Sequence, residues 1–204
     1  MFEQHLPHMT VKTILDVGCG HGMMLERLSG HGNKVFGIDI TPESLRYDKA
    51  RGLMVAEADA RNLPFLSNSF DLVYSLGVIE HFSGTEQALR EQVRVCRPGG
   101  IIIVVVPNLL TPYYLPGILF EIIARRGHNL LVTYGKPYSN RQLSKMLERA
   151  GCDNVFVEPY YGSAFLYVFM KKLNHRLVDF FERSFLSKYC GLVLWGMGCK
   201  RGVT

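Results

Sequence analysis

The segment from Thr13 to Gly22, which reads TILDVGCGHG, constrains the fold more than any other part of this chain. It begins with a short apolar run of the kind found in strands that are buried on both faces. Glycines at alternate positions, starting at Gly18, interrupt the run, and helical periodicity resumes at Met23. Glycine permits a tight turn and a close approach of the backbone to a ligand, while a helix start offers free N–H donors. The segment therefore predicts a strand–turn–helix unit that binds a ligand.

The glycine spacing separates two nucleotide-binding classes. A dinucleotide fingerprint needs its third glycine five residues after Gly18, where this chain has Met23. The third glycine comes one residue earlier, at Gly22. The stretch DVGCGHG thus resembles the first motif, D-x-G-C-G-x-G, of class I S-adenosylmethionine-dependent methyltransferases. A plain tight turn between a strand and a helix is the alternative interpretation of this stretch alone.

A second apolar strand, Lys34 to Ile40, carries an acid near its end at Asp39. Thr41 and Pro42 follow as the predicted N-cap and first residue of a helix. An acid in this place, 17 residues beyond the last glycine of the turn, suits hydrogen bonds to ribose hydroxyls, a device that the dinucleotide-binding fold also uses. A capping or solvated acid is the alternative.

A third strand is predicted over Leu53 to Ala58, and Asp59 follows it. In the methyltransferase family an acid here reaches the adenine amino group, and the resemblance implies that role for Asp59. A surface acid in a loop is the alternative. Two later passages also resemble the family: Leu63 to Val73, which is similar to its "LPF…SFDLV" entry into the fourth strand, and the Arg-Pro-Gly-Gly turn at 97–100 before an aliphatic strand.

The residues after the fourth strand, Leu76 to Phe82, should border the ligand site, because open α/β sheets bind ligands at the carboxyl ends of their strands. Similar sequences have Glu-His at this place, as Glu80 and His81 are here. A histidine can act as a base near neutral pH, so His81 is the candidate for proton handling. A histidine that only holds the loop by hydrogen bonds is the alternative.

The rest of the chain continues the alternation of helices and strands. Helices are predicted from Gly84 to Cys96 and from Ser139, as N-cap, to Ala150, and strands at 101–106, 154–158 and 192–195, the last as an edge-pairing strand. Strands separated by helices imply right-handed βαβ units and a parallel sheet. The resemblance implies an α/β fold with a doubly wound, seven-stranded, mostly parallel sheet whose last strand is antiparallel. We expect one domain over residues 1–204.

Two segments depart from this alternation. Residues 108–138 are aromatic and form a predicted lid that recognises substrate, with Tyr113, Tyr114 and Tyr138 as its candidate contacts. A surface helix that completes the core is the alternative. Residues 164–186 predict an amphipathic helix with basic and aromatic side chains, for which peripheral contact with a membrane and packing on the chain's own sheet or on a partner are both open.

Composition limits the kinds of binding partner and the cellular compartment that we expect for this chain. The chain is 48% apolar and carries a formal net charge of +5, but no block of Lys and Arg is long enough for a nucleic-acid-binding arm, so we expect no nucleic acid. Its five cysteines are odd in number and form no C-x-x-C pair, which predicts a reduced protein without structural zinc. With no signal peptide visible at the N-terminus, we expect a cytoplasmic location.

The resemblance therefore predicts an enzyme that binds S-adenosylmethionine, releases S-adenosylhomocysteine and uses no metal. The glycine turn would approach the methionine part, and Ile40 and Ala60 would sandwich the adenine. The cofactor-binding residues that it implies are Asp16, Gly18, Cys19, Gly20, Gly22, Asp39, Ile40, Asp59, Ala60 and Leu76. The branch that contains methyltransferase type 11 and quinone-biosynthesis enzymes suggests a small lipophilic or phenolic acceptor, methylated on oxygen or carbon. A non-catalytic, regulatory S-adenosylmethionine-binding domain and a nicotinamide-dependent oxidoreductase are the alternatives.

Overall fold

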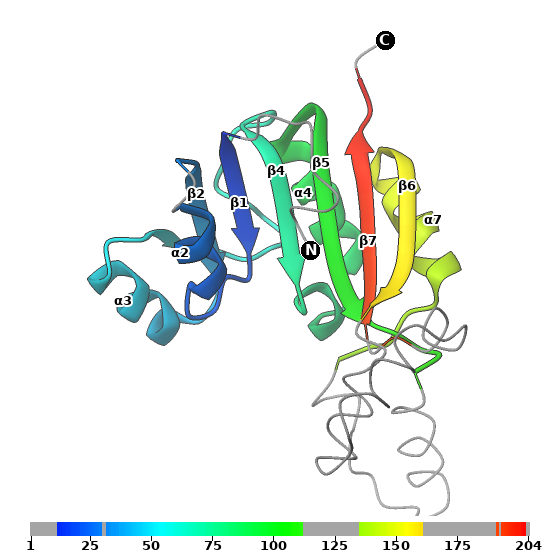
Figure 1. Cartoon of the computed structure of the whole chain (residues 1–204), viewed down its shortest axis with the longest axis horizontal. Helices are drawn as coiled ribbons and strands as arrows, with labels where there is room; N and C mark the ends of the chain where they lie inside the picture. Colours follow the sequence, from blue (N-terminus) through cyan, green and yellow to red (C-terminus); the bar gives the residue numbers. More distant parts are fainter. Residues whose placement is uncertain (1–11, 30–31, 112–134, 161–190, 192, 203–204) are drawn as a thin grey trace, which may run out of the picture.

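Seven strands form a single sheet in the order β3-β2-β1-β4-β5-β7-β6 (Figure 1). This computed structural model describes residues 12–29, 32–111, 135–160, 191 and 193–202. The strands are β1 (Thr13–Val17), β2 (Lys34–Asp39), β3 (Met54–Glu57), β4 (Phe70–Leu76), β5 (Cys96–Pro107), β6 (Cys152–Tyr160) and β7 (Val193–Lys200). Between them lie the helices α2 (Met23–Ser29), α3 (Pro42–Ala50), α4 (Thr85–Val95) and α7 (Asn140–Ala150) and the short 3-10 helix η1 (Ile79–His81).

The pairing of the strands confirms the predicted fold class. Strands β1 to β5 pair in parallel, and β7 runs antiparallel to both β5 and β6. The expected edge position of the last strand is wrong, because β7 lies between β5 and β6 and leaves β6 at the edge. Local apolar character could show that residues near Trp195 form a strand, but the neighbours of a strand depend on pairing with residues far away in the chain.

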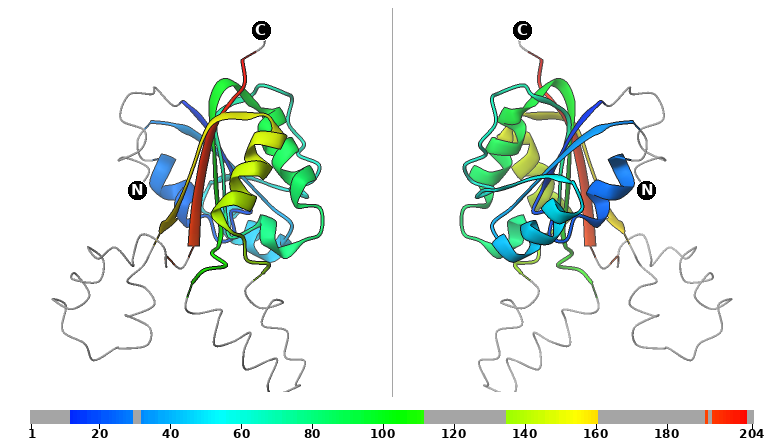
Figure 2. Two further views of the ribbon diagram at one scale, coloured as in Figure 1. Left: turned by 90° about the vertical axis from the view of Figure 1, so that its right-hand side faces the viewer. Right: turned by 90° about the vertical axis from the view of Figure 1, so that its left-hand side faces the viewer.

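Both faces of the sheet are buried, which explains the long apolar runs of its strands. On one face, Leu89 of α4 and Leu143 of α7 pack in a cluster with Val73 and Ile102 of the sheet. On the other face, Leu25 of α2 belongs to a second cluster with Ile14, Tyr74 and other strand residues. Figure 2 shows α4 and α7 on one side of the sheet and α2 on the other. The sheet is therefore doubly wound, as predicted.

The two predicted helix starts differ in how they are capped. Ser139 accepts a hydrogen bond from the Gln142 amide, and the Gln142 side chain accepts one from the Ser139 amide, so α7 begins with the expected cap in the form of a capping box. Thr41 stands at the N-cap of α3 without a side-chain capping bond. Its backbone amide donates instead to the Asp39 carboxylate over 2.8 Å, which ties the start of α3 to the end of β2.

Asn108 joins three segments that are distant in the sequence. Its buried side-chain amide donates to the carbonyl of Gly191, 83 positions away, and it forms a bridge with Tyr138 beside the end of β5. These contacts fix both ends of the predicted lid. Tyr113, Tyr114, most of that lid and the predicted helix at 164–186 lie outside the described residues. In the described part of the chain, no helix is both long and apolar enough to cross a membrane.

Candidate active site

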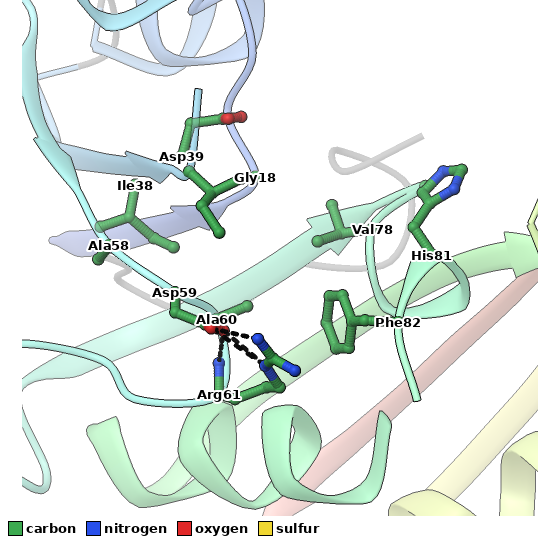
Figure 3. Close-up of a pocket in the computed structure, with 12 residues that line it drawn as sticks. Gly18, Ile38, Asp39, Ala58, Asp59, Ala60, Arg61, Val78, His81 and Phe82 are labelled. Atoms are coloured by element: carbon green, nitrogen blue, oxygen red, sulfur yellow. Dashed lines mark hydrogen bonds and ion pairs between the residues drawn. The ribbon is translucent and has the colours of Figure 1, made fainter. Parts of the chain in front are cut away.

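A cavity of about 310 Å³ opens where β1, β2, β3 and β4 end (Figure 3). The loops after these strands line it with Gly18, with residues 38–40 and 58–61, and with Gly77, Val78, His81 and Phe82. The parallel strand order reverses between β1 and β4. Ligands of open α/β sheets bind at this switch point, outside the carboxyl ends of the strands. The cavity is therefore in the expected place for a ligand and large enough for a small one.

Gly18, Gly20 and Gly22 of the first loop differ in what a side chain at each position would contact. All three have positive φ, which L-residues with side chains rarely adopt. A Cβ on Gly18 would also overlap the Val78 side chain, and one on Gly22 would lie 2.7 Å from the Leu53 side chain. Apart from its chain neighbours, no residue in the described part of the chain would lie within 4 Å of a Cβ on Gly20. Protein packing therefore requires a bare backbone at Gly18 and Gly22, whereas Gly20 faces open space.

Asp39 connects the glycine loop to the second strand. Its carboxylate accepts hydrogen bonds from the Gly20 amide and from the Thr41 amide, both over 2.8 Å. Asp39 is half-buried and lines the cavity. Each carboxylate oxygen offers two acceptor sites, so both oxygens keep capacity for a ligand hydroxyl.

Asp59 is held by a residue that the sequence analysis did not single out. The Arg61 guanidinium donates from Nε and Nη2 to the two Asp59 oxygens, and the Arg61 backbone amide donates to Oδ1. These bonds hold the pKa of Asp59 below its usual value, so the carboxylate is ionised. Arg61 also lines the cavity, as do Val78 and Phe82, which belong to the stretch from Leu76 to Phe82 that was expected to border the ligand site. Only the place of Arg61, two residues after a site acid, could have pointed to it.

Asp16 and Cys19 are not among the residues that line the cavity. Asp16 is only 4% exposed, and burial, with the nearby charges of Asp39 and Asp48, raises its pKa to about 7 against a hydrogen bond from Tyr74. Burial raises the pKa of the Cys19 thiol to about 12, so Cys19 is a neutral thiol and not a nucleophile.

His81 ends η1 as an exposed side chain on the cavity, while its neighbour Glu80 is buried. Burial raises the pKa of Glu80 to about 7. Tyr138, a predicted substrate contact, is only 3% exposed and packs in the core, with its hydroxyl 3.2 Å from the Thr85 hydroxyl. Leu76 is partly buried and packs against the core cluster on the α2 face.

The structure thus brings together six of the predicted site residues. Those that line the cavity are Gly18, Asp39, Ile40, Asp59, Ala60 and His81. The others that it describes surround the cavity or lie in the core. Among the described residues, no group of three or more His, Cys, Asp or Glu side chains is placed to hold a metal ion.

Comparison with known proteins relates part of the chain to a described family. Residues 15–104 match the model of a family described as a methyltransferase domain, and this stretch contains every cavity-lining residue. The match covers less than half of the chain, and over these residues the chain is similar to a methyltransferase domain. The domain is 35% identical over 107 residues to norajmaline N-methyltransferase of Rauvolfia serpentina, a match that covers 48% of this chain and 37% of that protein. The chain spans 34% to 55% of the length of the first curated relatives that it matches.

Solved structures confirm the methyltransferase fold. A S-adenosylmethionine-dependent methyltransferase from Archaeoglobus fulgidus has a TM-score of 0.70 and 20% identity, with 98% of this chain and 91% of that one covered. Phosphoethanolamine N-methyltransferase 2 of Haemonchus contortus, in complex with phosphomonomethylethanolamine and S-adenosylhomocysteine, also has a TM-score of 0.70, at 17% identity. That match covers 98% of this chain and 52% of the other. At these identities the likeness concerns the fold.

Proposed function

We propose that this chain transfers the methyl group of S-adenosylmethionine to a small acceptor. The observation that carries the proposal is the cavity itself, in which Gly18, Asp39 and Asp59 meet at the ends of three neighbouring strands. A glycine turn next to two acids on successive strand ends suits a nucleoside with an amino-acid tail. The match to the methyltransferase domain covers all of these residues.

The residues present fit the cofactor. Asp39 has free acceptor capacity for two ribose hydroxyls, and ionised Asp59 can accept from an adenine amino group. Ile40 and Ala60 both line the cavity and would offer apolar surface to that base. The open space at Gly20 leaves room for a ligand against the backbone of the turn. S-adenosylmethionine supplies an electrophilic methyl group on its sulfonium, so this chain mainly has to bind and orient the two reactants.

The methyl acceptor would bind on the side of the cavity that His81 and Phe82 line. His81 is exposed on the cavity and free to take a proton from an oxygen or nitrogen nucleophile. A phenolic or enol acceptor, methylated on oxygen or carbon, needs little help of this kind. We propose a small lipophilic or phenolic acceptor, with residues 108–138 as a lid within a single domain. Asn108 and Tyr138 fix the base of that lid.

Two measurements test the proposal. Calorimetric titration should show binding of S-adenosylhomocysteine and no binding of NADH; tighter binding of NADH would instead support the oxidoreductase alternative. A methyl-transfer screen over phenols, amines, sugars, lipids and protein side chains should then release S-adenosylhomocysteine with one class of acceptor. Binding of the cofactor without turnover on any of them would favour the non-catalytic alternative.

A further inference from the structure

The Arg61 side chain connects the two walls of the cavity. Its guanidinium makes a two-pronged ion pair with Asp59 on the β3 side, with Nη2 2.6 Å from Oδ2 and Nε 2.9 Å from Oδ1. On the other side, the guanidinium carbon lies 5.5 Å from the centre of the Phe82 ring, which follows η1. Figure 3 shows the guanidinium between Asp59 and the Phe82 ring. Arg61 is thus in the cavity but already committed to partners within the protein.

The beginning of α4 fixes Arg61 along its length. The Gln87 side-chain amide donates to the Arg61 carbonyl over 3.0 Å. Gly84 lies against the stem of the side chain, since a Cβ added at Gly84 would be 2.7 Å from the Arg61 Cδ. The backbone, the stem and the guanidinium are therefore each in contact with another part of the site. Arg61 has little freedom to turn away from Asp59.

This arrangement decides which part of Asp59 a ligand can use. A carboxylate has about four acceptor sites. The Arg61 amide and Nε take two on Oδ1, and Nη2 takes one on Oδ2, with Nε also 3.1 Å from Oδ2. The capacity left for a ligand is on Oδ2. An ionised carboxylate cannot donate a hydrogen bond, so a fixed Asp59 accepts a ligand N–H and repels a ligand carbonyl oxygen.

We propose that Arg61 is a positioning residue that makes this cavity select a purine with an amino group at position 6 over one with a carbonyl there. The inference rests on the proposed function, because it assumes that the adenine of the cofactor lies beside Asp59. Arg61 acts through Asp59 and need not touch the base. Without Arg61, the Asp59 carboxylate can rotate, and its free oxygen can accept a hydrogen bond from water instead of from the ligand. The discrimination between the two bases then falls.

The test compares two ligands whose bases differ at position 6 and in the proton that the deaminated base carries on the neighbouring N1. S-adenosylhomocysteine carries the amino group, and S-inosylhomocysteine, its deaminated analogue, carries a carbonyl. We expect calorimetry to show that the wild-type protein binds the first about 100-fold more tightly than the second, because the mismatch leaves the Asp59 acceptor facing another acceptor. In Arg61→Ala this ratio should fall to about tenfold or less. Arg61→Lys should also lower it, since lysine keeps the charge but lacks the planar fork.

The matched control is Arg90→Ala on the exposed side of α4. Arg90 is an exposed arginine whose pair with Glu86 spans 3.4 Å, and its replacement should leave both affinities unchanged. Because the readout is a ratio of two affinities, general loosening of the cavity would weaken both ligands equally. An unchanged ratio in Arg61→Ala and Arg61→Lys would therefore overturn the inference while leaving the proposed function intact. Failure of the wild-type protein to bind either ligand would overturn the proposed function and, with it, the inference.

Discussion

The amide of Gly20 donates a hydrogen bond of 2.8 Å to the carboxylate of Asp39, so the glycine loop and the end of β2 form one unit. Gly20 sits in the turn of that unit, where no described residue other than its chain neighbours lies within 4 Å of the place that a Cβ would take. The backbone at Gly20 is therefore accessible to a ligand. This relationship gives two predictions about cofactor binding.

Gly20→Ala should weaken binding far more than it weakens folding. Its φ of +52° costs an alanine about 1 kcal/mol, but no clash within the protein adds to that cost. We expect a tenfold or greater loss of S-adenosylhomocysteine affinity by calorimetry. Gly52→Ala is the matched control, because Gly52 has a φ of +76° and also faces open space, away from the cavity. Equal affinities in the two variants would show that nothing binds against Gly20.

Asp39→Ala should abolish methyl transfer with any acceptor. The substitution removes the acceptor proposed for the ribose hydroxyls, and it also leaves the amides of Gly20 and Thr41 without their partner. We expect the cofactor affinity to fall at least tenfold and the unfolding free energy to fall by about 1–2 kcal/mol. Glu43→Ala, which removes an exposed acid in the first turn of α3, is the control. If cofactor affinity barely changes in Asp39→Ala, the ribose assignment is wrong.

His81→Gln tests proton transfer separately from binding. We expect kcat with an acceptor that must be deprotonated to fall by about 100-fold, while the affinity for S-adenosylhomocysteine stays within twofold. Steady-state kinetics and calorimetry on the same preparation measure the two effects. A normal kcat with such an acceptor would show that His81 only borders the cavity.

Asp16 should make the protein less stable as the pH rises. Its pKa of about 7 in the folded state lies above the ordinary value of 3.8, so between these pH values the folded protein holds a proton that the unfolded chain has lost. The contribution of Asp16 to the unfolding free energy therefore decreases as the pH rises from about 4 to about 7. Relative to Asp16→Asn, we expect the wild-type protein to lose about 2.5 kcal/mol between pH 5 and pH 8, measured by urea unfolding. A constant difference between the two proteins would contradict the raised pKa.

Asp71 should have the opposite dependence on pH. Its carboxylate accepts hydrogen bonds from the amides of Lys12 and Thr13 and from the Arg97 side chain. Burial alone would raise the pKa of Asp71, but these bonds hold it at about 2. Its contribution to stability is present above pH 3.8 and is lost as the pH falls towards 2. We expect Asp71→Asn to cost about 2 kcal/mol at pH 7 and roughly half of that at pH 3.

Asp153→Asn provides the comparison for the Asp71 experiment. Asp153 also pairs with an arginine, Arg201, but both side chains are more than half exposed. Such pairs contribute at most about 1 kcal/mol. A loss of stability in Asp71→Asn no larger than that in Asp153→Asn would show that the buried network has no special effect.

Much of this site could be predicted because its information is local. The place of Asp39 and Asp59 at strand ends follows from apolar runs that stop at an acid, and Ser139 was expected as a cap from the residues next to it. Tyr138 could not be placed, because its burial depends on Thr85, 53 positions away. Nor does the composition around Gly18 and Gly20 distinguish them, although a Cβ on Gly18 would overlap Val78 and one on Gly20 would meet none of the described side chains. The difference between these two glycines depends on tertiary contacts between loops that are far apart in the sequence.

The position of β7 in the sheet imposes an order on folding. Strand β6 has β7 as its strand partner in the sheet, and β7 is also its link to β5. As the chain leaves the ribosome, residues 152–160 are therefore made before the strand that pairs with them. Until residues 193–200 arrive, the hydrogen-bonding groups of β5 and β6 on that side must be satisfied by water or by a chaperone.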